Sequence, residues 1–132
     1  KIVTYNQLLV CSLKKSAAEI FIVGGQFSPL YSMNVGAIAQ DVLKQFYFNK
    51  AFFSCSGIDL QQKIVYTTEM ESLLMKKIAL ENASSAYLLL DHTKMDKHGF
   101  LKFVSTDAFT KIICDKNDNT SFTDLPDNFH II

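Results

Sequence analysis

Three polar clusters each follow an apolar run of the sequence, and each carries groups that can bind a ligand. The clusters are Gly24-Gly25-Gln26, Ser56-Gly57-Ile58-Asp59 and Asp91-His92-Thr93-Lys94. Glycines without side chains let backbone N–H groups approach an anion closely. Asp59 offers an acceptor to hydroxyl groups, and Lys94 offers a positive charge to a phosphate or carboxylate. Together these groups predict a site for a small, hydroxylated and phosphorylated molecule.

Each of these residues also has an ordinary structural explanation. A glycine pair such as Gly24-Gly25 after a strand commonly forms a plain turn. Asp59 and Asp91 can each cap the turn that follows them, and Lys94 can be a solvated surface lysine. Their recurrence after three separate apolar runs is what favours a site.

Two further candidates lie on a predicted helix. Thr68 and Glu71 have the spacing of a capping box, in which the side chains of both residues bond to the first turn of the helix. Glu71 is explained by that box unless the site lies over the helix end. Lys76 and Lys77 can form a solvated helix edge, or one of them can point into the site.

Other chemistries find less support in the sequence. His92, His98 and His130 lack the spacing of metal ligands, and no HExxH motif occurs. The serines around Cys55 lie outside any G-x-S-x-G elbow, and the phosphate-binding and dinucleotide-binding glycine motifs are absent. We therefore predict no catalytic residue, no metal and no cofactor.

The elements that position the clusters follow from hydrophobic periodicity. Short apolar runs predict buried strands at 19–23, 51–55 and 86–90, and apolar spacing of about 3.6 residues predicts helices between them. Alternation of this kind predicts a parallel α/β sheet, in which ligands bind at the carboxyl ends of the strands. The remaining predicted elements are an extended stretch at 2–4, a helix at 5–15, a helix capped by Asn34 through Phe46, an extended arm at 64–66, a helix from 67–71 to 82, extended pieces at 100–104, 111–114 and 129–132, and a loop with one short helix at 115–128.

Composition limits the functions that the sequence itself can perform. The chain has 132 residues, enough for one domain over 1–132, and its 13 basic and 13 acidic side chains balance. It therefore lacks the broad basic surface that binds DNA or anionic lipid, and no apolar run reaches the length of a membrane span. Its three cysteines are far apart, which is typical of a reducing, cytoplasmic compartment. The chain starts without Met inside an extended stretch, so we expect a domain incomplete at its N-terminus.

The order of these motifs resembles the C-terminal effector-binding domain of DeoR-family transcriptional repressors. No single motif is specific, but their order and spacing are. The matching stretches are Ile2-Val3-Thr4, Val23-Gly24-Gly25 with Gly36 downstream, Lys50-Ala51-Phe52-Phe53 into Ser56-Gly57-Ile58-Asp59, Glu71 on a Lys-bearing helix, Leu88-Leu89-Leu90-Asp91-His92-Thr93-Lys94, and Ile112-Ile113-Cys114-Asp115.

The resemblance implies an α/β/α sandwich with the fold of ribose-5-phosphate isomerases and CoA transferases. It implies a sensor that binds a phosphorylated sugar, forms homo-oligomers and controls operator DNA through an N-terminal helix-turn-helix that this sequence lacks. The effector-binding residues would be Gly24, Gly25, Asp59, Glu71, Lys76, Asp91 and Lys94.

The sequence departs from the family pattern in several places. The Gly-Thr-Thr loop expected to hold the phosphate is missing, Tyr5 follows Thr4 where Asn is usual, and Lys63 replaces a glycine. Met75 stands at the usual lysine position with Lys76 beside it. These differences leave open which sugar phosphate binds.

Two alternative functions remain. A sugar-phosphate isomerase on the same fold would need a carboxylate base, which by the resemblance falls at about Lys76, and lysine cannot replace it. An oligomerisation module with a degenerate pocket is the other. Sensing is the favoured prediction.

Overall fold

The computed structural model describes residues 1–116 and 125–132, and the chain divides into two compact units, Lys1–Tyr47 and Phe48–Ile132. Part of the loop and short helix predicted at 115–128 therefore lies outside the described residues. Each unit has its own strands and helices and is described by itself.

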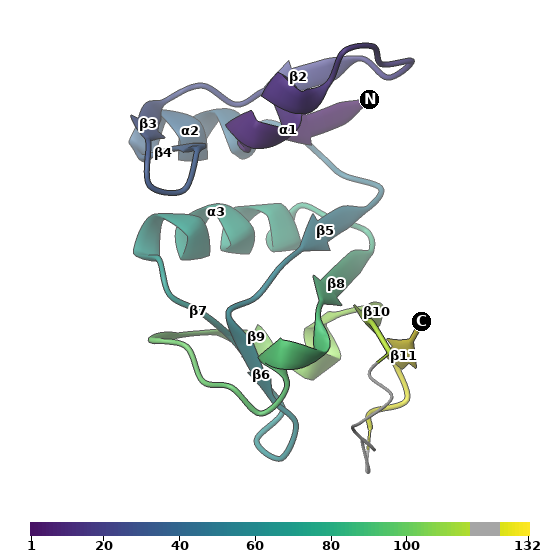
Figure 1. The fold of residues 1–132 in the computed structure, drawn as a ribbon. Helices are drawn as coiled ribbons and strands as arrows, with labels where there is room; N and C mark the ends of the chain where they lie inside the picture. The colour runs from purple at the N-terminus through teal and green to yellow at the C-terminus, as the bar shows by residue number, and fades with distance from the viewer. Residues whose placement is uncertain (117–124) are drawn as a thin grey trace. The chain divides into compact units, whose positions relative to one another are not determined.

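The first unit contains a short parallel strand pair, a hairpin and two short helices (Figure 1). The predicted extended stretch and the first predicted buried strand pair with each other in parallel. The elements of the first unit are β1 (Ile2–Thr4), α1 (Gln7–Ser12), β2 (Ile20–Ile22), β3 (Gln26–Ser28), β4 (Met33–Val35) and α2 (Ala37–Leu43).

The helix predicted to start at Asn34 is wrong at its N-terminal end. Asn34 lies in β4, which pairs with β3 in an antiparallel hairpin, and α2 begins only at Ala37 after Gly36. The Asn34 side-chain amide donates a hydrogen bond to the Val23 carbonyl at 2.8 Å. It therefore links β4 to the residue that follows β2 and does not cap a helix. The turn before β4 places Ser32 at a φ of 49°, which returns the chain along β3. The first helix is also shorter than predicted.

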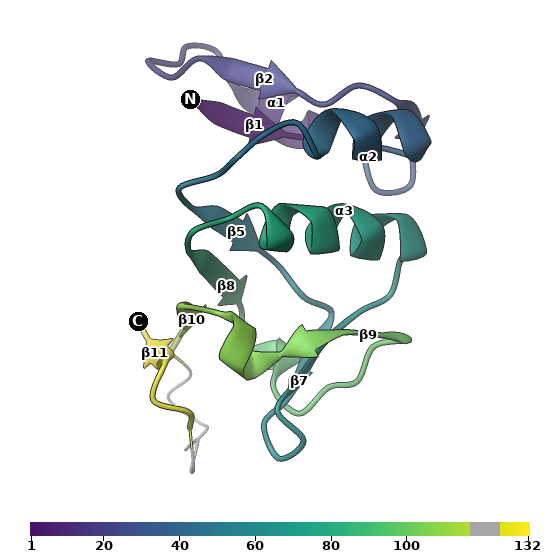
Figure 2. The same ribbon diagram turned by 180° about the vertical axis from the view of Figure 1, so that it is seen from behind.

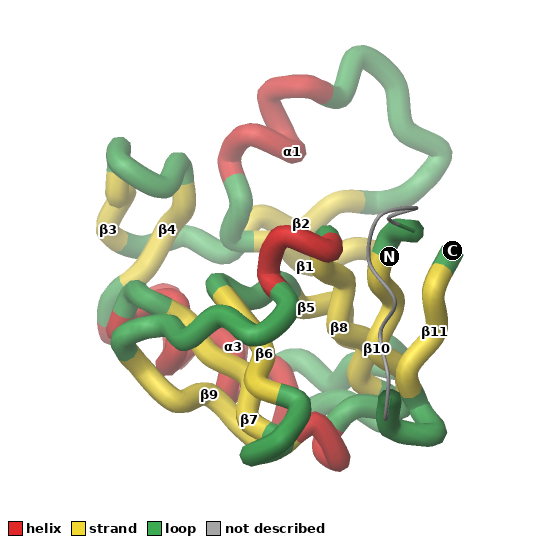
Figure 3. Tube along the Cα trace, turned by 60° about the horizontal axis from the view of Figure 1, so that its bottom comes forward, coloured by secondary structure: helices red, strands yellow, loops and turns green. Residues whose placement is uncertain are grey.

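The second unit contains a parallel sheet that includes two of the three predicted buried strands, those at 51–55 and 86–90, whereas the strand predicted at 19–23 lies in the first unit (Figure 3). Four strands lie in the order β11-β10-β8-β5, and every neighbouring pair is parallel. The strands are β5 (Ala51–Phe53), β8 (Ala86–Leu90), β10 (Lys111–Cys114) and β11 (Phe129–Ile131). All four correspond to predicted strands or extended pieces, and the α/β fold class is confirmed.

A second sheet in this unit is antiparallel. The cluster after β5 itself forms β6 (Gly57–Asp59), which pairs with β7 (Ile64–Thr67), and β7 pairs with β9 (Leu101–Ser105) (Figure 2). In the described part of this unit, the helical elements are α3 (Met70–Glu81) and the short 3₁₀ turns η1 (His92–Lys94) and η2 (Thr106–Ala108).

The predicted capping box of α3 is wrong. The N-cap of α3 is Glu69, which makes no side-chain cap hydrogen bond, so Thr68 does not hold the N-cap position that the box requires. β7 continues through Thr67, and the exposed Thr68 only links the strand to the helix. Glu71 lies in the first turn of the helix without the role that the box gave it.

Alternate residues of the parallel sheet pack into the core of the second unit together with residues of the antiparallel sheet, of α3 and of the connecting segments. Leu88 and Ile112, opposite each other on β8 and β10, are fully buried. Phe53 packs against Phe103 and Phe109, with 5.8 Å between ring centroids in both pairs. Among the described residues, no helix is both long and apolar enough to cross a membrane.

Candidate ligand-binding site

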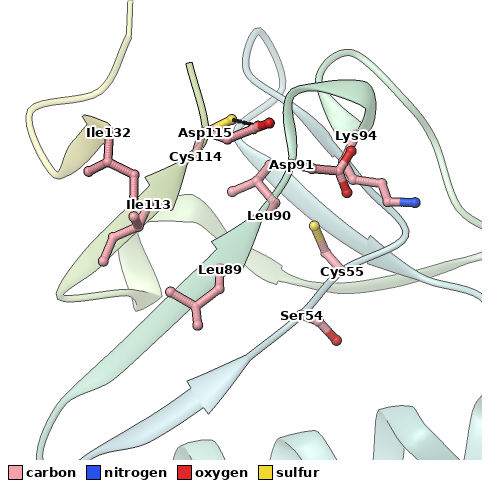
Figure 4. A pocket seen from close by; sticks show the side chains of 10 residues that line it. All are labelled: Ser54, Cys55, Leu89, Leu90, Asp91, Lys94, Ile113, Cys114, Asp115 and Ile132. Carbon is pink, nitrogen blue, oxygen red and sulfur yellow. Dashed lines mark hydrogen bonds between the residues drawn. The ribbon is translucent and has the colours of Figure 1, made fainter. Parts of the chain in front are cut away.

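A pocket of about 510 Å³ lies at the carboxyl ends of β5, β8 and β10 (Figure 4). This is the sheet edge where the sequence predicted a site, because parallel strands present their carboxyl ends on the same side. The pocket is built wholly from the second unit. It is lined by Ser54, Cys55, Leu89, Leu90, Asp91, Lys94, Ile113, Cys114, Asp115 and Ile132.

Two of the predicted site residues, Asp91 and Lys94, meet in this pocket. Asp91 follows β8 and caps η1, where its Oδ1 accepts hydrogen bonds from the Thr93 N–H at 3.0 Å and from the Thr93 hydroxyl. The hydroxyl bond and then the N–H bond hold the pKa of Asp91 below its ordinary value. Asp91 thus performs the capping role foreseen for it and keeps a negative charge beside the half-buried Lys94.

Asp115 is a pocket residue that the sequence reasoning did not select. It follows β10 as Asp91 follows β8, so the rule of strand ends could have found it. Its Oδ1 accepts from the His92 N–H at 2.5 Å, and its Oδ2 lies 2.9 Å from His92 Nδ1. Bonding to the ring and to the N–H of His92 lowers the pKa of Asp115.

Two thiols in the pocket were also missed. Burial raises the pKa of Cys55 and of Cys114 to about 11, so both thiols are protonated at neutral pH. A protonated thiol is a poor nucleophile, and neither cysteine is suited to covalent catalysis. The nearby charges of Lys76 and Lys94 act in the opposite direction and lower the pKa of Cys55.

Lys76 is buried, with 7% of its surface exposed, and is not on a solvated helix edge. Its Nζ donates to the Ser54 carbonyl at 2.9 Å and to the Thr67 hydroxyl at 3.3 Å, and lies 5.9 Å from the centre of the Phe103 ring. Burial lowers its pKa. Among residues 1–116 and 125–132, no carboxylate forms an ion pair with this ammonium group. Because Ser54 lines the pocket, Lys76 contributes a positive charge just behind the end of β5.

Asp59 lies outside the pocket lining and has both carboxylate oxygens engaged. Oδ1 accepts from the Gln62 N–H at 2.8 Å, and Oδ2 lies 2.8 Å from His98 Nε2. These two bonds, that of Gln62 first, lower the pKa of Asp59. The bond to Gln62 is the turn cap that the sequence analysis named as the alternative role. A bridge between Ile58 and Met95 places β6 beside the segment that follows Lys94.

The other predicted residues lie outside the pocket. Glu71 is half-buried in the first turn of α3 and does not line it. Gly24 and Gly25 belong to the first unit. Gly25 has a φ of 132°, and a Cβ there would collide with the Val35 carbonyl and Ala39, so glycine is required for this close turn. A ligand contact by Glu71, Gly24 or Gly25 stays a prediction.

Comparison with known proteins identifies the family. A model of the DeoR C-terminal sensor domain matches residues 1–116. The chain belongs to this family. The resemblance noted from the motifs is therefore confirmed, and with it the assignment to a family of transcription regulators.

Curated relatives carry the names of sugar regulators. The chain is 30% identical over 108 residues to a lactose phosphotransferase system repressor of Staphylococcus aureus, an alignment that covers 80% of the chain and 42% of the relative. It is 29% identical over 116 residues to an L-fucose operon activator of Haemophilus influenzae, covering 88% of the chain and 43% of the relative. The chain thus spans about two-fifths of the length of these relatives.

Proposed function

We propose that this chain senses a phosphorylated sugar or a related metabolite for a transcription regulator of sugar metabolism. The observation that carries the proposal is the convergence of Asp91, Lys94 and the β5 and β10 ends on one pocket in a DeoR sensor domain. The names of the relatives support a sugar as the signal, since two of them refer to lactose and L-fucose.

The pocket offers several groups that suit a sugar phosphate. The Lys94 ammonium group is suited to the phosphate, and the buried charge of Lys76 behind Ser54 adds to the positive potential at the same strand end. Asp91 offers carboxylate oxygens to sugar hydroxyls. Leu89 and Ile113 give an apolar floor for the C–H face of the ring.

Binding without catalysis fits these groups better than isomerisation does. An isomerase requires a base near the substrate carbon, and a carboxylate or a thiolate could serve. The two pocket thiols are protonated. Hydrogen bonds to Thr93 and His92 lower the pKa of Asp91 and of Asp115, which makes both carboxylates weak bases. By the resemblance, Lys76 occupies the position of the isomerase base. We therefore propose a sensor that is not an enzyme.

The signal would reach DNA through a part of the regulator outside this sequence. The balanced charge of the chain does not suit operator binding, and we propose that an N-terminal helix-turn-helix makes that contact. A ligand changes operator affinity only as far as it binds the two states of the regulator differently. Homo-oligomerisation and a cytoplasmic location, where operator DNA is found, belong to the same proposal.

Titration calorimetry with hexose 6-phosphates, hexose 1-phosphates and pentose 5-phosphates tests the proposal. We expect at least one to bind, and Lys94→Ala to weaken its binding about tenfold, as loss of a charged hydrogen bond does. Lys111→Ala is the matched control, because Lys111 is an exposed lysine at the opposite, amino-terminal end of β10. In the full-length regulator, Lys94→Ala should leave operator binding intact.

Two results would overturn the proposal. One is a calorimetric titration in which the parent chain binds none of these phosphates, or binds one with the same affinity as the Lys94→Ala variant. The other is turnover of ribose 5-phosphate by the full-length protein, which would establish the isomerase function instead.

A further inference from the structure

Lys94 reaches the pocket on a connection that belongs to neither sheet. The connection runs from His92 to Gly99, between β8 and β9, and is called the arm below. It contains only the single turn η1, so its own backbone hydrogen bonds cannot fix its position. Contacts with neighbouring elements must hold it in place.

The first contact holds the start of the arm to the end of β10. The Asp115 carboxylate bonds to both the backbone N–H and the ring Nδ1 of His92. Both side chains are partly exposed, at 34% for His92 and 49% for Asp115. His92 lies two residues before Lys94 in the sequence, and its partner Asp115 lines the pocket.

The second contact holds the far end of the arm to β6. His98 Nε2 lies 2.8 Å from Asp59 Oδ2, and the His98 ring packs on Tyr66 with 5.1 Å between centroids. Asp59 is itself fixed by the N–H of Gln62. This explains why a buried aspartate after β5 has no oxygen left for the pocket.

The arm also packs closely on β6 and on the residue that precedes it, Ser56. Met95 is buried and bridges Ile58 of β6. A Cβ on Gly57 would overlap the backbone of Lys97, and one on Gly99 would overlap the Ser56 hydroxyl. Lys94 therefore projects from a segment that is fastened on both sides of it, by two histidine–aspartate pairs from different elements.

We propose that His92 and His98 are positioning residues that hold the arm, and through it Lys94, in the geometry that binds the phosphate. The Lys94 side chain loses conformational entropy when it binds a phosphate. If the backbone of the arm is already held in place, only the side chain has to be ordered, and the entropy cost of binding is smaller. The effect on ligand binding rests on the proposed function, whereas the fastening of the arm does not.

Tryptic cleavage of the ligand-free chain tests the fastening. Trypsin cuts after Lys94 and Lys97 only when the arm leaves its site, and cleavage after Lys111 reports opening of the same unit as a whole. We expect His92→Ala and His98→Ala to speed cleavage in the arm about two- to tenfold relative to Lys111, as loss of a partly exposed hydrogen bond does. His130→Ala, which changes an exposed histidine on β11, should have no effect.

Conservative variants separate fastening from general destabilisation. An asparagine at 92 keeps a donor near the place of Nδ1, and a glutamine at 98 keeps one near the place of Nε2. His92→Asn and His98→Gln should restore slow cleavage in the arm. Cleavage that is equally slow in the two alanine variants and the parent would overturn the proposal, as would failure of both conservative variants to restore it.

The same variants are then titrated with the hexose and pentose phosphates. We expect the two alanine variants to bind about two- to tenfold more weakly and the two conservative variants to bind like the parent. If the parent binds no phosphate, the proposed function fails while the cleavage rates still decide the fastening. If the parent binds and the alanine variants bind equally well, the positioning role fails while the proposed function stands.

Discussion

Gly57→Ala should loosen the hairpin that supports the arm without changing any charged group. A Cβ at this position would overlap the carbonyl carbon and oxygen of Lys97. These are backbone atoms, so no side-chain rotation relieves the clash, and either β6 or the arm must move. Adding a group to such a tightly packed place costs about 1–3 kcal/mol. Loss of glycine flexibility in the unfolded chain returns about 0.4–1 kcal/mol. The central values of these two ranges leave an expected net loss of about 1 kcal/mol.

Urea unfolding followed by circular dichroism measures this loss as a lower midpoint. Gly24→Ala is the stability control, because a Cβ there meets no atom within 4 Å. Its midpoint should equal or slightly exceed that of the parent. If Gly57→Ala unfolds at the same urea concentration as Gly24→Ala, then the arm does not approach β6 as closely as described.

Three further predictions concern thiols, charge and core packing. Cys11 is exposed and should react with iodoacetamide at pH 7.5 well before Cys55, whose pKa burial raises to about 11; equal rates would contradict the burial of Cys55. Bonds to His92 lower the pKa of Asp115, so its carboxylate stabilises the fold above about pH 4 and this contribution disappears as the pH falls through the lowered pKa. Urea midpoints of the parent and Asp115→Asn should therefore differ at pH 6, and this difference should shrink as the pH is lowered below about 4; a constant difference would refute this. Phe109→Ala should cost about 3–5 kcal/mol in urea unfolding, since the ring is buried between two other core phenylalanines; a loss below about 1 kcal/mol would contradict that packing.

The parallel sheet could be predicted because its strands are short, continuous apolar runs. Residues 86–90 and 111–114 have the predicted bounds, since buried strands leave little choice of residue type. The hairpin of β3 and β4 was missed because each of its strands is only three residues long and has a mixture of apolar and polar side chains. Asn34 was assigned to a helix cap, since asparagine favours that position, but tertiary contact with Val23 uses its amide instead.

The position of the pocket could be predicted better than the residues that line it. The rule that ligands bind at carboxyl strand ends located the pocket and found Asp91 and Lys94. It could not show that Asp59 turns away to bond with His98, because residues 39 positions apart in sequence come together only through the fold. The burial of Lys76 was equally hidden, since its partners Ser54 and Thr67 belong to other elements.

Amide chemical-shift mapping by NMR tests the central claim most directly. The isotope-labelled chain is titrated with the sugar phosphate that binds tightest in calorimetry. If the pocket at the ends of β5, β8 and β10 is the sensor site, the largest shifts will fall at residues 54–55, 90–94 and 113–115. Shifts that leave these three stretches unchanged while others move would contradict it.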